Sequence, residues 1–218
     1  MRQQQGKFIL FDIGEFASWL GDAQVNRAIE LVQNHHTYDP SYKDFNGSNH
    51  FERLQAMEAF HINVRHFSEI AQNFTTFPDG TLALCRSLET APAGIKGANT
   101  GGICIENLGN FDMNQDQMTA VHKDSILKLN ALLCKKFGLT PNSKSIVYHH
   151  WFDLNTGHRT DGIGTTKSCP GTGFFGGNSV SLAEGNFIPL IAGALADLLT
   201  PAAEDGDRTE IGTVAGTN

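Results

Sequence analysis

Three residues suited to metal chemistry lie far apart in the chain. His35 ends a strand-like run, His149 follows the hydrophobic run 145–148, and Cys169 lies in a polar loop that reads Lys-Ser-Cys-Pro-Gly. Neutral imidazole and thiolate are ligands that zinc prefers, and catalytic zinc sites use three protein ligands and keep a fourth position for water. Zinc held in this way can polarise a carbonyl group and lower the pKa of bound water to about 7. We therefore expect His35, His149 and Cys169 to converge on one zinc ion.

The spacing of these residues is by itself a weak metal signal. The chain contains no Cys-x-x-Cys pair and no His-Glu-x-x-His motif. A single histidine in such a place is often a hydrogen-bonded core or loop residue, and Cys169 could instead be a nucleophile paired with His149. Neighbouring histidines also allow an exchange of roles, because His36 or His150 could be the ligand in place of the residue before it.

Composition and charge restrict the class of protein. The 218 residues, 40% of them hydrophobic, are enough to bury one substantial core. The formal charge of −7 argues against nucleic acid or an anionic membrane surface as the main partner. The four cysteines lack the clustered pattern of a disulfide-stapled secreted module, and Cys85, Cys104 and Cys134 lie in apolar runs typical of a core.

The chain shows no uninterrupted apolar stretch of a signal peptide and no run that approaches the roughly 20 apolar residues of a membrane span. We therefore expect a soluble protein that is made in the cytoplasm. If it acts outside the cell, its release or export must follow another route.

The two candidate histidine ligands lie at the ends of strand-like patterns. The partial alternation of residues 27–35 places Ile29, Leu31 and His35 on one side of a strand, so that His35 lies on an otherwise apolar face. Turn chemistry at 78–80 favours a hairpin between two strand-like runs. The other strand patterns cover residues 70–77, 81–85, 103–108 and 145–149.

Helical patterns separate these strands. Asn49 and Glu52 form a possible capping box for one helix, and Gly138 is a fitting end for the clearest helix, which covers residues 118–137. A brief helix is expected before Leu20 and another over 187–199. The interleaved elements predict an α/β fold in which a mixed central β-sheet is flanked by helices. We expect one domain over residues 1–199 and a linker-like tail over 200–218.

Five motifs in the same order resemble the zinc-dependent N-acetylmuramoyl-L-alanine amidases, which share a fold with the peptidoglycan recognition proteins and the amidase-type phage lysozymes. The resemblance covers roughly residues 8–191. It implies zinc ligation by His35, His149 and Cys169. The motifs that carry it are His35-His36-Thr37-Tyr38, Phe77-Pro78-Asp79-Gly80-Thr81 with Arg86, Gly97-Ala98-Asn99 with Ile103-Cys104-Ile105-Glu106, Ile146-Val147-Tyr148-His149, and Lys167-Ser168-Cys169-Pro170-Gly171.

The resemblance also implies catalytic roles for Glu106 and Lys167. The family uses a Lys two residues before the last ligand and, in some members, a Glu on the strand of the Ile-x-Ile-Glu type, and Lys167 and Glu106 fit these positions. Lys167 could donate a hydrogen bond to the oxyanion of a tetrahedral intermediate, and Glu106 could take a proton from water and pass it to the leaving amine. Each residue also has a plainer interpretation, Lys167 as a solvated loop cation and Glu106 as a structural carboxylate bonded to the 98–99 loop.

One position departs from the family pattern. Many relatives carry a Tyr where this chain has Gln72. An amide can donate a hydrogen bond but cannot act as an acid or base. The departure increases the expected importance of Glu106 as the base.

The resemblance implies a peptidoglycan hydrolase of the endolysin or autolysin type, which cleaves the amide between N-acetylmuramic acid and L-alanine of the stem peptide. Peptidoglycan is then the expected partner, and loops around Lys96 and Asn155 would form the walls of its groove. Two other classes stay open. One is a non-catalytic module that binds muropeptide, although such relatives typically lack the ligand Cys, and the other is a peptidase with Cys169 as nucleophile.

Overall fold

The computed structural model describes residues 2–200. Seven strands form one sheet in the order β1-β2-β5-β4-β6-β3-β7. Strands β4, β6, β3 and β7 run parallel, whereas β1, β2, β5 and β4 pair antiparallel in turn. The predicted mixed sheet and the hairpin between β4 and β5 are confirmed. The strands are Gln3–Gln5 (β1), Phe8–Phe11 (β2), Leu31–His36 (β3), Phe74–Thr76 (β4), Leu82–Leu84 (β5), Gly102–Asn107 (β6) and Ile146–Tyr148 (β7).

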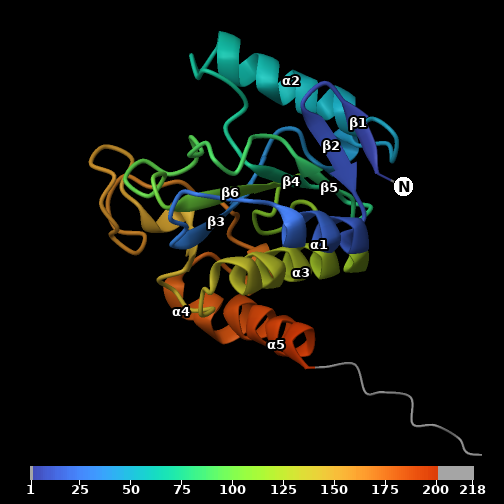
Figure 1. Cartoon of the computed structure of the whole chain (residues 1–218). Helices are drawn as coiled ribbons and strands as arrows, with labels where there is room; N and C mark the ends of the chain where they lie inside the picture. The colour runs from blue at the N-terminus through green and yellow to red at the C-terminus, as the bar shows by residue number, and fades with distance from the viewer. Residues whose placement is uncertain (1, 201–218) are drawn as a thin grey trace, which may run out of the picture.

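Helices cover both faces of this sheet (Figure 1). Helix α2, His50–Asn63, lies on one side, and α1, Ile13–Asp22, α3, Ala120–Phe137, and α5, Ile188–Leu199, lie on the other. Short helical turns join the remaining segments. They are η1 (Tyr42–Asp44), η2 (His149–Trp151), η3 (Phe174–Gly176), α4 (Val180–Leu182) and the π-helical turn η4 (Ala183–Phe187).

Local side chains explain where the helices begin and end. Asp12 and Glu15 form a capping box at the start of α1, and Gly138 ends α3 in the left-handed conformation at φ 66°. Helix α2 does begin after Asn49, but the predicted capping box with Glu52 is wrong. Oδ1 of Asn49, the atom that would cap the helix, instead accepts from the backbone N–H of Asn46 at 3.1 Å, because the preceding loop offers a competing local donor.

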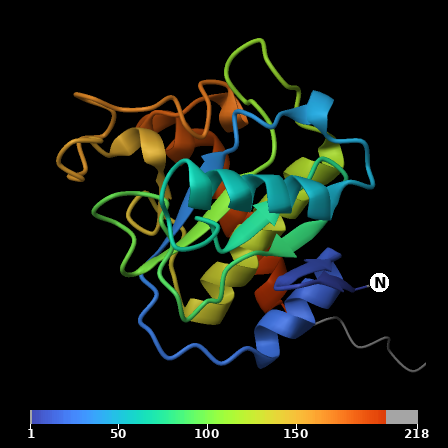
Figure 2. The ribbon, with the colours of Figure 1, turned by 90° about the horizontal axis from the view of Figure 1, so that it is seen from above.

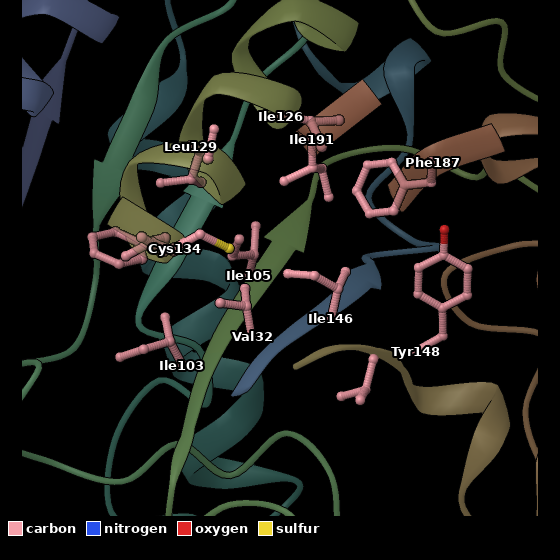
Figure 3. Packing of buried hydrophobic residues seen from close by; sticks show 14 of the residues in the cluster. Val32, Ile103, Ile105, Ile126, Leu129, Cys134, Ile146, Tyr148, Phe187 and Ile191 are labelled. Carbon is pink, nitrogen blue, oxygen red and sulfur yellow. The ribbon is translucent and has the colours of Figure 1, made fainter. Parts of the chain in front are cut away.

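The main apolar core lies between the sheet and helices α3 and α5 (Figure 3). Burying each large aliphatic or aromatic side chain contributes about 1.5–3 kcal/mol. This packing holds the carboxyl ends of β6, β3 and β7 at one edge, where the candidate ligands lie. Its central members are Val32, Ile103, Ile105 and Ile146 from the strands, Ile126 and Leu129 from α3, and Phe187 and Ile191 from the C-terminal segment.

The C-terminal helical segment Val180–Leu199 is long and apolar enough to cross a membrane by length and composition alone. This corrects the expectation that no segment approaches a membrane span. A mostly buried core helix passes the same test, but only 22% of the apolar window is buried here, although Ile188 and Ile191 pack in the core against α3. The predicted tail lies outside the described residues from position 201 onward, so the domain boundary after residue 199 stays a prediction.

Candidate metal centre

The two candidate histidine ligands meet because their strands are parallel neighbours. β3 pairs with β7 in a register that places Asn34 opposite Tyr148. The next residue on each chain is His35 and His149, and the two imidazole ring centroids lie 4.9 Å apart. Strand β7 ends at this point and the chain turns into η2. The register of two strands therefore brings together residues that are more than a hundred positions apart.

Cys169 reaches the same place from the long loop that follows η2. Its carbonyl oxygen accepts a hydrogen bond from the His150 backbone at 2.8 Å, and its Sγ lies 3.5 Å from Nδ1 of His35. One ligand atom each from His35, His149 and Cys169 lies within 4.8 Å of the other two, and all three residues are buried. Atoms this close can share one zinc ion, whose bonds to nitrogen and sulfur are about 2.0–2.3 Å long.

The histidines next to these residues make other contacts. Nδ1 of His36 accepts a hydrogen bond from the Phe111 backbone at 3.1 Å. Nδ1 of His150 lies 2.7 Å from the carbonyl oxygen of Lys167 and must donate, because a carbonyl oxygen only accepts. Each pair thus supplies one residue to the cluster and one that holds a neighbouring loop.

Burial sets the protonation of the cluster. It lowers the pKa of His149 to about 3, with help from the positive charge of Lys167, and holds the pKa of His35 well below its ordinary value. Both imidazoles are therefore neutral near pH 7, as metal ligation requires. Burial also raises the pKa of the Cys169 thiol. A protonated thiol is a poor nucleophile, whereas a cation at this place would favour the thiolate.

Glu106 lies on β6 directly across from His35, and its Oε1 is 4.0 Å from Nδ1 of His35. Burial raises the pKa of this carboxyl to about 8, although the charge of Lys167 opposes the shift. Its Oε2 is buried without a hydrogen-bond partner among the described residues. The structural bond to the 98–99 loop is not formed, and the Ala98 backbone N–H, one of the donors it would need, bonds the carbonyl oxygen of Ile95 instead. A carboxyl group with a buried oxygen that lacks a partner, beside the neutral imidazole of His35, fits a cation site.

Lys167 and Gln72 differ in their access to this centre. Lys167 is exposed, and its charge is close enough to lower the pKa values of His149 and Glu106. Gln72 is fully buried, and its amide nitrogen donates to Thr75 Oγ1 at 2.9 Å. The hydrogen-bond partners of Gln72 are thus outside the ligand cluster.

The sequence analysis did not identify two residues that lie near this centre, Gln33 and Cys104. Gln33 shares the face of β3 with His35 and is fully buried, so the prediction of an otherwise apolar face is wrong. Cys104, expected in the apolar core, joins His35 and Glu106 in a second group of ligand atoms within 4.8 Å of one another. The sequence contained a signal for both residues. Gln33 lies two positions before His35 and Cys104 two positions before Glu106, and residues i and i+2 of a strand share a face.

The 94–99 segment, which leads into the amino end of β6, meets the loop that follows η2 (Figure 2). Nζ of Lys96 donates to the carbonyl oxygen of Asn155. Gly97, at φ +87°, approaches the second loop so closely that a Cβ atom there would lie 2.1 Å from the Gly157 carbonyl oxygen. Only glycine permits both this conformation and this approach. The loops around Lys96 and Asn155 therefore form one continuous segment of surface.

Sequence comparison decides the family. The N-acetylmuramoyl-L-alanine amidase family model, Amidase_2, matches residues 25–172, which include all three members of the ligand cluster. This chain belongs to that family. No curated protein matches this chain.

Solved structures support the fold of this amidase-family protein. Drosophila PGRP-LB is 19% identical with a TM-score of 0.55, and the match covers 70% of this chain and 81% of the other. The endolysin amidase LysCS from Clostridium intestinale is 22% identical with a TM-score of 0.51, covering 67% and 78%. Peptidoglycan recognition protein-LE, solved in complex with tracheal cytotoxin, is 21% identical with a TM-score of 0.54, covering 67% and 76%.

Proposed function

We propose that this protein is a zinc-dependent peptidoglycan hydrolase that cleaves the amide between N-acetylmuramic acid and L-alanine of the stem peptide. The observation that carries the proposal is the gathering of His35, His149 and Cys169 beside Glu106 in a member of the amidase family. Peptidoglycan as substrate is supported by the related fold of recognition protein-LE, whose bound ligand is a monomeric diaminopimelic acid-type peptidoglycan.

His35, His149 and Cys169 would hold the metal. Two neutral imidazoles and one thiolate match the donors that zinc accepts, and they leave room for a fourth ligand. Zinc bound there would supply Lewis-acid chemistry, which polarises a carbonyl oxygen and acidifies water.

Glu106 would move the proton. Its carboxylate takes a proton from the attacking water and later delivers that proton to the leaving amine of L-alanine. Because burial raises its pKa to about 8, the carboxyl can both accept and release a proton near neutral pH. Lys167 would stabilise the oxyanion of the tetrahedral intermediate with its exposed ammonium group.

Binding of muropeptide without hydrolysis is the second candidate. The replacement of the family Tyr by the buried Gln72 favours it, because Gln72 cannot exchange a proton. The cluster with Cys169 favours hydrolysis. A peptidase with Cys169 as nucleophile is disfavoured by the raised pKa of its buried thiol.

Digestion of purified peptidoglycan separates these functions. The amidase should release stem peptides with L-alanine at the amino end, detected by mass spectrometry, and a chelator should stop the release until zinc is restored. Sedimentation with peptidoglycan without any released peptide would support the binding module. Release that resists the chelator but is lost on thiol alkylation would support the cysteine peptidase and contradict our proposal.

We further propose that the protein acts on the bacterial cell wall as an endolysin or autolysin, after release or export from the cytoplasm. The fold shared with an endolysin amidase supports this setting. Lysis assays in which the purified protein is added to wall preparations and to intact cells would test it.

A further inference from the structure

We propose that Gln33 sets the tautomer of His35 and thereby increases the affinity of the centre for metal, so that Gln33 is a positioning residue for the site. This inference rests on the proposed zinc chemistry. It goes beyond it by assigning a role to a residue that touches neither the substrate nor the metal.

The Gln33 side chain is enclosed between the His35 ring and the 94–99 loop. Its Oε1 lies 3.4 Å from Nε2 of His35, on the side of the ring opposite to Cys169. Its amide nitrogen donates to the carbonyl oxygen of Ala98 at 2.9 Å and lies 3.4 Å from Oδ1 of Asn99. Gln33 is fully buried, so water does not compete for these contacts.

The Ala98 carbonyl oxygen determines the direction of this chain of hydrogen bonds. A carbonyl oxygen only accepts, so the NH2 group of Gln33 must face Ala98 and its Oε1 must face His35. Oε1 also only accepts, so Nε2 of His35 must carry the hydrogen. A neutral imidazole has one N–H, and the lone pair is then left on Nδ1, the atom that lies 3.5 Å from Cys169 Sγ.

Two glycines show that the protein is built closely around this amide. A Cβ atom on Gly94 would lie 2.2 Å from Oε1 of Gln33 and 3.2 Å from Nε2 of His35. A Cβ atom on Gly102 would lie 2.6 Å from the Gln33 amide nitrogen. Oδ1 of Asn99 in turn accepts from the backbone of Gly94 at 3.0 Å and of Ile95 at 2.9 Å, which holds the loop against the amide. Gln33 therefore has little freedom to turn its acceptor away from His35.

Metal affinity provides the first test. Gln33→Met keeps the approximate size of the side chain but removes the acceptor. We expect its zinc dissociation constant, measured by competition with a chromophoric chelator, to rise about 10–100-fold, which is the usual cost of losing such a partner of a ligand.

Asn130→Leu is the matched control. Asn130 is fully buried and exchanges hydrogen bonds with Asn34 on the other face of the same strand, at 2.8 and 3.1 Å. Its loss removes a buried amide without touching the His35 ring, so zinc affinity should stay within about threefold of the parent, well below the effect of losing a ligand's partner. Thermal unfolding followed by circular dichroism verifies that both variants are folded.

The tautomer itself provides the second test. Nitrogen-15 NMR of the metal-free protein with labelled histidine, assigned by comparison with His35→Gln, should show the hydrogen of His35 on Nε2. Gln33→Met should show a mixture of tautomers. A parent protein with the hydrogen on Nδ1, or a Gln33→Met variant with parental zinc affinity, would overturn the inference. Neither readout requires hydrolysis, so loss of the proposed amidase function would be recognised separately.

Discussion

The two faces of strand β3 hold buried polar groups in opposite ways. On the face toward α3, Asn34 and Asn130 exchange hydrogen bonds in both directions, and apolar residues surround the pair. On the other face, His35 and Glu106 lie together, and Oε2 of Glu106 has no partner among the described residues.

The difference separates stability from chemistry. A closed pair satisfies its own donors and acceptors and joins a helix to a sheet. A cluster that leaves an acceptor free inside the protein costs stability, and such costs are found where a ligand or reaction uses the group. Substitutions on the two faces should therefore affect different properties.

The largest difference is expected between two buried thiols. Cys169→Ala should lose stoichiometric zinc and with it detectable hydrolysis, because two histidines alone bind the metal weakly. Cys134→Ala removes a buried thiol from α3 and should keep both zinc and activity, with a loss of about 1 kcal/mol in the free energy of unfolding. Metal analysis of the purified variants checks this. Full zinc content in Cys169→Ala would contradict the assignment.

Glu106→Gln should separate catalysis from metal binding. We expect kcat for stem-peptide release to fall about 10²–10⁴-fold while zinc is retained, since the amide keeps the shape but cannot accept the proton. Glu30→Gln is the control, because Glu30 is exposed next to the opposite end of β3. A Glu106→Gln variant with activity near that of the parent would leave the protein without its proposed base.

The apolar face should respond in stability alone. Leu129→Ala should lower the free energy of unfolding by about 2–5 kcal/mol through lost burial and a cavity, with unchanged activity per folded molecule. Leu190→Ala, at a position 44% exposed, should cost less than about 1 kcal/mol. Urea denaturation measures both. Equal effects at the two positions would argue against the core that Figure 3 shows.

A pH dependence of stability is expected from His122, which is fully buried between Tyr42 and Thr76. Burial lowers its pKa from 6.5 to about 3. Below pH 6.5 His122 binds a proton in the unfolded chain but stays neutral in the folded protein. The free energy of unfolding therefore falls as the pH drops toward 3. The slope is up to about 1.4 kcal/mol per pH unit.

His122→Gln should reduce this slope in metal-free protein. Denaturation curves between pH 7 and pH 4 test this expectation, because they cover most of the range from about pH 6.5 to about pH 3 in which only the unfolded chain binds the proton. An unchanged slope in His122→Gln would place the titration on other histidines.

Much of the fold was predictable because its signals are local. Gly138 ends α3 because a left-handed residue is needed after the last turn, and the turn at Asp79-Gly80 joins the β4–β5 hairpin. The Asn49–Glu52 capping box failed because the backbone N–H of Asn46 donates to the side-chain oxygen of Asn49. Apolar periodicity and turn chemistry indicate elements well, but they do not choose among several possible partners for one amide.

The candidate site was predictable in part. The order of the motifs indicated His35, His149, Cys169 and Glu106. The register of β3 with β6 and β7 brings His35, His149 and Glu106 together, and the loop after η2 brings Cys169 to them. The neighbouring Gln33 was missed, since a glutamine in a strand carries no sign of burial in its own sequence.

The sequence by itself determined the alternation of strands and helices, the chemical types of the donors and their order along the chain. Only the tertiary structure decided which histidine of each pair faces Cys169, which oxygen of Glu106 stays free and which atom of Gln33 faces His35. The physical reason is that the partners that orient these groups, such as Phe111, Lys167 and Ala98, come from loops distant in sequence. Hydrogen-bond direction is set by those partners after the chain has folded.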